Sequence, residues 1–88
     1  MAWTVELRPA ALKFLQKTDR QTADRITRFL LDRVATQDDP RGIGKALTGP
    51  LKSYWSYRVG DHRLLCEFLD QRLVILVVKI GDRKDVYR

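Results

Sequence analysis

The amino-acid sequence predicts an α+β fold in which two N-terminal helices pack on one face of a small, mainly antiparallel sheet. Three observations support this class: a short alternating segment begins the chain, apolar residues then recur at helical spacing, and strand-like segments fill the second half. The expected order of elements is β-α-α-β-β-β. Because the chain has 88 residues, a single domain over residues 1–88 is expected.

The first two expected elements are a strand and a short helix. Apolar and polar residues alternate over residues 3–8, which is the period of a strand with one buried face. Pro9 ends this strand and suits the first turn of a helix, because the N–H group that proline lacks needs no partner there. A short helix is therefore predicted over residues 10–17.

A longer amphipathic helix is predicted over residues 19–35. Thr18 followed three residues later by Gln21 has the form of a capping box, which marks a helix start. Apolar residues then recur at spacings of three and four, and charged residues occupy the opposite face. The apolar stripe consists of Ala23, Ile26, Leu30 and Val34.

The second half of the chain is rich in predicted strands. Residues 36–50 contain Asp, Pro and Gly in place of a periodic pattern and are expected to form a connecting loop. Residues 55–59 and 62–68 alternate on either side of a Gly-Asp turn, which predicts a β-hairpin. Residues 73–80 form a continuous apolar strand that is expected inside the sheet. A further turn separates it from residues 86–88, where a last short strand would fit.

The predicted hairpin brings two arginines together. With a two-residue turn at Gly60 and Asp61, Arg58 lies directly opposite Arg63, with Cβ atoms about 5 Å apart. Like charges at this spacing destabilise a sheet unless they share an anion. Apolar residues occupy the other face, so the arginines are expected on the face that the helices leave uncovered. There they could hold one phosphate, with a pair of solvated surface arginines as the simpler alternative.

The charge of the chain favours a polyanionic partner. Lys and Arg number 17 against 11 acidic residues, which gives a net charge of +6 and a pI near 9.9. Residues 1–40 carry seven basic and six acidic side chains, whereas residues 41–88 carry ten and five. The excess in the second half indicates a surface for nucleic acid there, with improved solubility as the alternative explanation.

Several other classes of protein are excluded by the sequence. Cys66 is the single cysteine, so neither an internal disulfide nor a multi-cysteine metal site is expected. No apolar run approaches the roughly 20 residues that span a bilayer, and no signal peptide pattern is present. Gly44 and Lys45 lack the spacing of a nucleotide-binding loop. The expectation is a cytoplasmic protein without a metal, a cofactor or a membrane partner.

Three segments together resemble the RelE branch of the RelE/ParE toxin superfamily. They are residues 45–49, residues 55–63 with the sequence W-S-Y-R-V-G-D-H-R, and residues 80–87 with the sequence I-G-D-R-K-D-V-Y. The resemblance extends over nearly the whole chain and implies a RelE-like domain. It also implies the toxin of a type II toxin–antitoxin pair, a ribosome-dependent endoribonuclease that cleaves mRNA in the A site by metal-free attack of the RNA 2′-hydroxyl. The implied partners are a RelB-like antitoxin, the ribosome and mRNA, with operator DNA bound only through the antitoxin complex.

The resemblance also implies site residues. Arg58 and Arg63 would stabilise the phosphate in the transition state, Arg83 would protonate or neutralise the leaving 5′-oxygen, and Tyr87 would stack on or orient a base. Further contacts with the substrate are expected from Lys45, Lys52, Ser56, Lys84 and Arg88.

Two departures from the family pattern leave the general base unassigned. Ser56 stands where many relatives carry a basic residue, and Asp82 stands where several carry a basic residue or histidine. His62 is expected at the edge of the apolar layer, turned away from the two arginines, and Cys66 is expected in the core. The alternatives are a ParE-like inhibitor of DNA gyrase and a catalytically weak RNA-binding or co-repressor component. For the polar face of residues 19–35, a solvated surface is expected, with an antitoxin or ribosomal RNA contact as the alternative.

Overall fold

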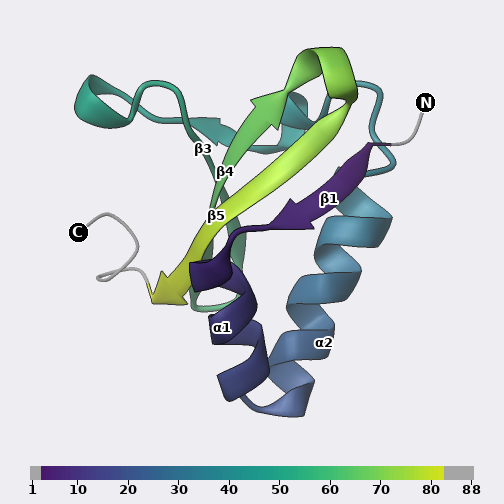
Figure 1. The fold of residues 1–88 in the computed structure, drawn as a ribbon, viewed down its shortest axis with the longest axis vertical. Helices are drawn as coiled ribbons and strands as arrows, with labels where there is room; N and C mark the ends of the chain where they lie inside the picture. Colours follow the sequence, from purple (N-terminus) through teal and green to yellow (C-terminus); the bar gives the residue numbers. More distant parts are fainter. Residues whose placement is uncertain (1–2, 83–88) are drawn as a thin grey trace.

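The computed structural model describes residues 3–82 (Figure 1). Its α-helices are α1 (Pro9–Lys17) and α2 (Arg20–Arg28), and a π-helical turn, η1 (Phe29–Val34), continues α2. Its strands are β1 (Thr4–Leu7), β2 (Lys45–Ala46), β3 (Trp55–Val59), β4 (His62–Leu69) and β5 (Val74–Asp82). The 3-10 turns that connect these elements are η2 (Pro40–Ile43), η3 (Gly49–Leu51) and η4 (Asp70–Arg72). The last short strand suggested at residues 86–88 lies outside the described residues.

The described strands form one sheet in the order β1-β5-β4-β3-β2. β1 is parallel to β5, and the other neighbouring pairs are antiparallel, so the predicted class is confirmed. The connecting loop predicted over residues 36–50 contains one strand that was not predicted. Lys45 and Ala46 pair with Ser56 and Trp55 as the edge strand β2. Two residues are too few to show a periodic pattern, so only the pairing with β3 reveals this strand.

The start of α2 differs from the predicted capping box. Asp19, rather than Thr18, is the N-cap, and its carboxylate accepts a hydrogen bond of 2.9 Å from the Thr22 N–H. The Thr22 hydroxyl donates a second hydrogen bond of 2.7 Å to the same carboxylate. Thr18 instead ends α1, where its N–H donates to the Phe14 carbonyl. Aspartate and threonine are both good N-cap residues, and the capping-box spacing pointed to the residue before the actual cap.

The helix predicted to reach residue 35 changes its winding at Phe29. In the π-helical turn the Ala35 N–H donates a hydrogen bond of 2.8 Å to the Leu30 carbonyl, five residues earlier. Residues five apart lie roughly 140° apart around an α-helix. The bonds of a π-turn bring them nearly into line along the axis. Leu30 and Ala35 are therefore both buried, because the wider turn directs both side chains into the core.

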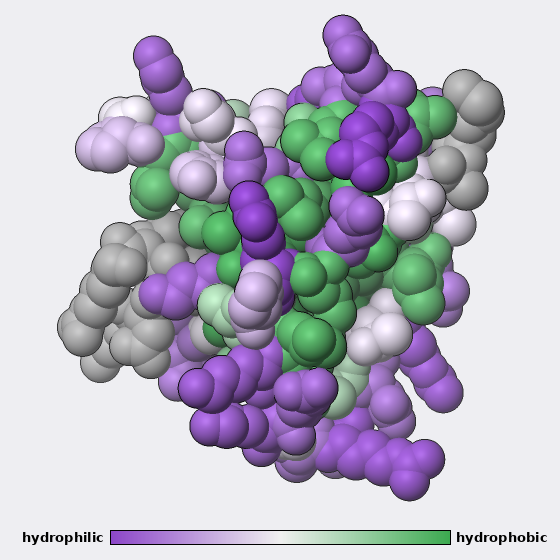
Figure 2. All heavy atoms as spheres, in the orientation of Figure 1, coloured by the Kyte–Doolittle hydropathy of each residue, from purple (hydrophilic) through white to green (hydrophobic). Residues whose placement is uncertain are grey.

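The core lies between the two helices and one face of the sheet (Figure 1). Its buried side chains include Ile26 and Leu30 from the helical layer and Leu64, Ile75 and Val77 from the sheet. Figure 2 shows hydrophilic side chains gathered around the ends of α1 and α2 that adjoin their connection, with hydrophobic residues across the middle of the view. Within residues 3–82, no helix has the length and apolar character needed to cross a membrane.

Replacing Asp19 with alanine is expected to lower the urea midpoint of unfolding, because the Thr22 N–H loses its partner. The hydrogen bonds from the Thr22 side chain and backbone lower the pKa of Asp19. A carboxyl group whose pKa is lower in the folded state stabilises the fold above its ordinary pKa, and this contribution disappears as the pH falls through the folded value. The difference between wild type and Asp19→Ala should therefore be largest at neutral pH and smaller in acid.

The control for this measurement is Asp24→Ala, which removes an exposed carboxylate from the same helix without touching the cap. Urea titrations at several pH values measure both variants. A difference between wild type and Asp19→Ala that is equal at neutral pH and in strong acid would contradict the capping role.

Candidate functional site

The β3–β4 hairpin brings the two predicted arginines together. Arg58 lies opposite Arg63 across a two-residue turn, in the register that the sequence predicts. Gly60 in this turn has a φ of +60°, a left-handed conformation that glycine adopts at little cost. On the neighbouring strand Arg63 lies opposite Gly81, so β5 places no side chain beside it. The hairpin therefore presents both guanidinium groups on one face of the sheet.

A pocket of about 630 Å³ opens on this face. Arg58 and Arg63 line it together with Lys45 from β2 and Ser56 from β3. Lys45 pairs directly with Ser56 in the ladder, which adds a third cation to the same concave surface. Guanidinium groups donate paired hydrogen bonds to anionic oxygens, so a pocket with this lining can bind a phosphate.

The two hairpin arginines are available for an anion. Arg58 is exposed and Arg63 is half-buried. The Arg58 Nε donates one long hydrogen bond, of 3.4 Å, to the Gly60 carbonyl. Across residues 3–82, neither guanidinium group takes part in an ion pair. The repulsion between the opposed arginines is therefore not offset by any described carboxylate, and a bound anion would relieve it.

Tyr57 forms a wall between the pocket and the core. Its side chain is 2% exposed, and its hydroxyl donates a hydrogen bond of 2.7 Å to the Pro40 carbonyl. Burial raises the pKa of Tyr57, so the hydroxyl remains a donor. A Cβ atom on Gly44 would lie 2.9 Å from the tyrosine ring, so this close packing requires glycine. The alternation along residues 55–59 places Tyr57 on the buried face, and only the structure shows that it also lines the pocket.

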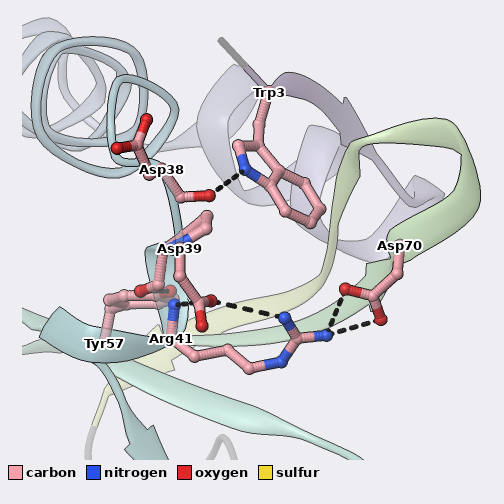
Figure 3. Close-up of polar contacts among 7 residues, drawn as sticks. Trp3, Asp38, Asp39, Arg41, Tyr57 and Asp70 are labelled. Atoms are coloured by element: carbon pink, nitrogen blue, oxygen red, sulfur yellow. Dashed lines mark hydrogen bonds and ion pairs between the residues drawn. The ribbon is translucent and has the colours of Figure 1, made fainter. Parts of the chain in front are cut away.

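The loop that leads into β2 is held by polar contacts (Figure 3). The Arg41 guanidinium lies between Asp39 and Asp70, with Nη2 at 2.6 Å from both Asp70 carboxylate oxygens. The hydrogen bonds to Asp70 raise the pKa of Arg41. On the same loop, the Trp3 indole donates a hydrogen bond of 3.2 Å to the Asp38 carbonyl. Arg41 and Asp70 are 29 residues apart, so no local pattern in the sequence could reveal this pair.

The remaining predicted site residues are not among the described residues that line the pocket. Lys52 is exposed after η3 and does not line the pocket, unlike Lys45 and Ser56. The four predicted residues that lie outside the described part of the chain are Arg83, Lys84, Tyr87 and Arg88.

His62 and Cys66 lie on the helix side of the sheet, as expected. The His62 ring packs edge-on against Phe14, with ring centroids 5.4 Å apart, and its Nε2 is 3.8 Å from the Asp82 carboxylate. Burial raises the pKa of the Cys66 thiol to about 12, which leaves it unreactive at neutral pH. Neither residue lines the pocket of the paired arginines.

Comparison with known proteins gives the family of the chain. The model of the family described as "ParE toxin of type II toxin-antitoxin system, parDE" matches residues 5–87. The chain belongs to this family. Toxin RelK from Mycobacterium tuberculosis is 43% identical over 67 residues, which cover 72% of this chain and 75% of RelK. This ParE-family protein is thus a toxin of the type II toxin–antitoxin class, and its predicted membership of the RelE/ParE superfamily is confirmed.

Solved structures of similar toxins share the fold of this ParE-family toxin. The crystal structure of the toxin–antitoxin complex RelBE2 from Mycobacterium tuberculosis contains a chain that matches with a TM-score of 0.85 and 23% identity, covering 94% of this chain and 100% of that one. The isolated Escherichia coli RelE toxin matches with a TM-score of 0.73 and 19% identity, covering 98% and 92%. The predicted RelE-like architecture is confirmed by these matches.

Proposed function

We propose that this ParE-family toxin is a ribosome-dependent endoribonuclease that cleaves mRNA in the A site and so inhibits translation. The observation that carries the proposal is the pairing of Arg58 with Arg63 at one pocket, with Lys45 beside them. Opposed cations are unfavourable in a sheet unless they bind an anion. The RNA backbone offers such an anion at every linkage. The 43% identity with a protein named as a toxin supports the same class of activity.

In the proposed reaction the RNA acts as its own nucleophile. The 2′-oxygen forms a bond to the adjacent phosphorus while the bond from phosphorus to the 5′-oxygen breaks. The 2′-hydroxyl loses its proton to a base and the leaving oxygen gains a proton, which gives a 2′,3′-cyclic phosphate and a 5′-hydroxyl. Arg58 and Arg63 stabilise the charge on the phosphorus oxygens, which is a task of position and electrostatics.

Other residues are assigned supporting roles in this proposal. Arg83 follows Asp82 directly in the sequence and would neutralise or protonate the leaving oxygen, and Tyr87 would stack on or orient a base. Lys45 and Ser56 would contact the RNA from the pocket itself. We further propose that the RNA strand, farther from the cleaved linkage, contacts Lys52, Lys84 and Arg88.

The proton acceptor is proposed to come from the ribosomal complex. Arginine is a poor base because its pKa exceeds about 12, and no histidine, aspartate or glutamate is among the residues of the described part of the chain, 3–82, that line the pocket. A toxin without its own base in the pocket would depend on the ribosome to align the RNA and accept the proton. This accounts for the proposed dependence on the ribosome.

The proposed partners follow from the same class. The RelBE2 structure is a toxin–antitoxin complex, and a RelB-like antitoxin is proposed to silence this chain as well. Operator DNA would be bound only through that complex. A toxin that acts on mRNA within ribosomes would act in the cytoplasm and would need no membrane partner.

The test is a cleavage assay with purified toxin and translating ribosomes. Wild-type toxin should cut mRNA in the A site and leave ribosome-free mRNA intact, and Arg83→Ala should abolish the cuts while the circular dichroism spectrum stays unchanged. Arg72→Ala, at an exposed position that does not line the pocket, should cut like wild type. Intact mRNA with wild-type toxin would overturn the proposal.

The name of the matched family favours a second candidate, inhibition of DNA gyrase by protein contact. A supercoiling assay with purified gyrase distinguishes the two candidates. Inhibited supercoiling together with uncut mRNA would support gyrase as the target. A third candidate, a catalytically weak RNA-binding or co-repressor component, rests on Ser56, which adds no charge to the pocket. It would bind RNA without cutting it.

A further inference from the structure

A second concave surface lies on the helix side of the hairpin tip. This groove of about 390 Å³ runs between α2, η1 and the turn that joins β3 to β4. Among residues 3–82, four arginines line it, and Asp32 is the single acidic residue of the lining. The four are Arg25, Arg28, Arg33 and Arg58. We refer to this surface as the α2 groove.

The π-helical turn builds one wall of the α2 groove. Arg28 and Arg33 are five residues apart, so an uninterrupted α-helix would direct them roughly 140° apart. The π-turn over Phe29–Val34 brings residues at this spacing nearly into line, and both arginines line the same groove. π-turns inside α-helices occur frequently at functional sites. Here the turn adds Arg33 to the helical wall, which already carries Arg25 and Arg28.

The hairpin turn forms the opposite wall. A Cβ atom on Gly60 would lie 3.0 Å from Nη1 of Arg25, so the absence of a side chain at Gly60 lets the guanidinium group approach the turn. Across residues 3–82, the guanidinium groups of Arg25, Arg28 and Arg33 form no ion pair, not even with Asp32. All three side chains are exposed. The groove therefore carries a concentrated positive charge that the described part of the chain does not neutralise.

Arg58 connects the α2 groove to the pocket of the paired arginines. Its side chain lines both surfaces, so the pocket and the groove adjoin at Arg58 and form one basic path. A polymer with one negative charge per unit fits this continuous path. We propose that the α2 groove binds the phosphate backbone of the RNA strand that extends from the cleaved linkage. This inference rests on the proposed function, because the RNA must first occupy the pocket.

An acidic protein segment is the competing occupant, and the lining argues against it. Segments of protein partners are commonly anchored by large apolar side chains that fill desolvated pockets. The apolar residues that line the α2 groove are Phe29 and Val59, of which Val59 is 6% exposed and Phe29 packs edge-on against Tyr57. Both are engaged in the core, so the described lining of the groove offers charge without an apolar anchor. RNA backbones are bound by surfaces of this kind.

The test measures binding of RNA in the absence of ribosomes. The probes are single-stranded, 2′-O-methylated oligonucleotides, which cannot be cleaved, of about 12 nucleotides and about 4 nucleotides. The groove variant is Arg28→Ala with Arg33→Ala. The matched control is Arg20→Ala with Arg72→Ala, which removes the same charge from exposed positions outside both surfaces. Circular dichroism verifies that both variants are folded.

The groove variant should bind the long oligonucleotide about 10-fold more weakly than wild type. The slope of log affinity against log salt should decrease in magnitude by about 1.4, since two phosphate contacts are lost and each removes about 0.7. Its affinity for the short oligonucleotide should be unchanged, and the control should bind both probes like wild type. Equal binding of the long probe by the groove variant and the control would overturn the proposal. The proposal would also be overturned if the groove variant bound a polyglutamate peptide more weakly than wild type but bound RNA with unchanged affinity. This experiment measures RNA binding and not cleavage. Its outcome can therefore be distinguished from the outcome of the ribosome assay, which tests the proposed function.

Discussion

Replacing Arg63 with alanine is expected to lower the rate of mRNA cleavage on ribosomes about 100- to 1,000-fold, the usual loss when one donor to a developing negative charge is removed. Arg63 is half-buried, lies opposite Arg58 and forms no ion pair within residues 3–82. Its removal should therefore disturb little except the pocket. The initial rate of A-site cleavage measures the effect.

Arg63→Lys tests whether the shape of the guanidinium group matters. Lysine keeps the charge but cannot donate two parallel hydrogen bonds to one phosphate, so it should restore only part of the lost rate. Arg72→Ala removes an exposed arginine that does not line the pocket and serves as the control. Cleavage by folded Arg63→Ala at the wild-type rate would remove Arg63 from the catalytic machinery.

Tyr57→Ala is expected to reduce the free energy of unfolding by about 3–5 kcal/mol, as is usual when a large buried aromatic side chain is truncated. The ring is 2% exposed and packs against Phe29, with ring centroids 6.0 Å apart. Tyr57→Phe keeps the ring but leaves the buried Pro40 carbonyl without its donor, which should cost about 1–3 kcal/mol. Urea unfolding followed by fluorescence measures both variants.

Tyr54→Phe is the matched control for the hydroxyl of Tyr57. The Tyr54 side chain is half-buried, and among residues 3–82 its hydroxyl forms no hydrogen bond, so its removal should change stability by less than about 0.5 kcal/mol. An unfolding free energy of Tyr57→Phe equal to that of wild type would show that the bond to Pro40 contributes nothing. In that case another contact would have to hold this wall of the pocket.

The hairpin was predictable because its determinants are local. A two-residue turn fixes which residues face each other, and the apolar alternation on both strands decides which face is buried. The opposition of Arg58 and Arg63 follows from these two facts, and the structure has this register. Pro9 likewise marked the start of α1 by its own chemistry.

Other features depend on contacts between distant segments. β2 forms because Lys45 and Ala46 pair with β3, and a segment of two residues is too short for the sequence to predict that pairing. The π-turn brings both Leu30 and Ala35 into the core, which helical periodicity by itself does not predict. Asp19 is the N-cap in place of Thr18 because α2 begins one residue later than the capping-box pattern predicts.

The sequence by itself determined the net charge, the alternation of apolar and polar residues in the hairpin and its two-residue turn. These features together determine that Arg58 lies opposite Arg63 at the centre of the candidate site. These properties act over a few neighbouring residues, so they can be recognised along the chain. Only the tertiary structure decided that Tyr57 closes the pocket, that Arg41 ties its loop to Asp70, and that Arg58 joins the pocket to the α2 groove. Each of these depends on how segments far apart in the chain pack together, and packing is decided by the whole core at once.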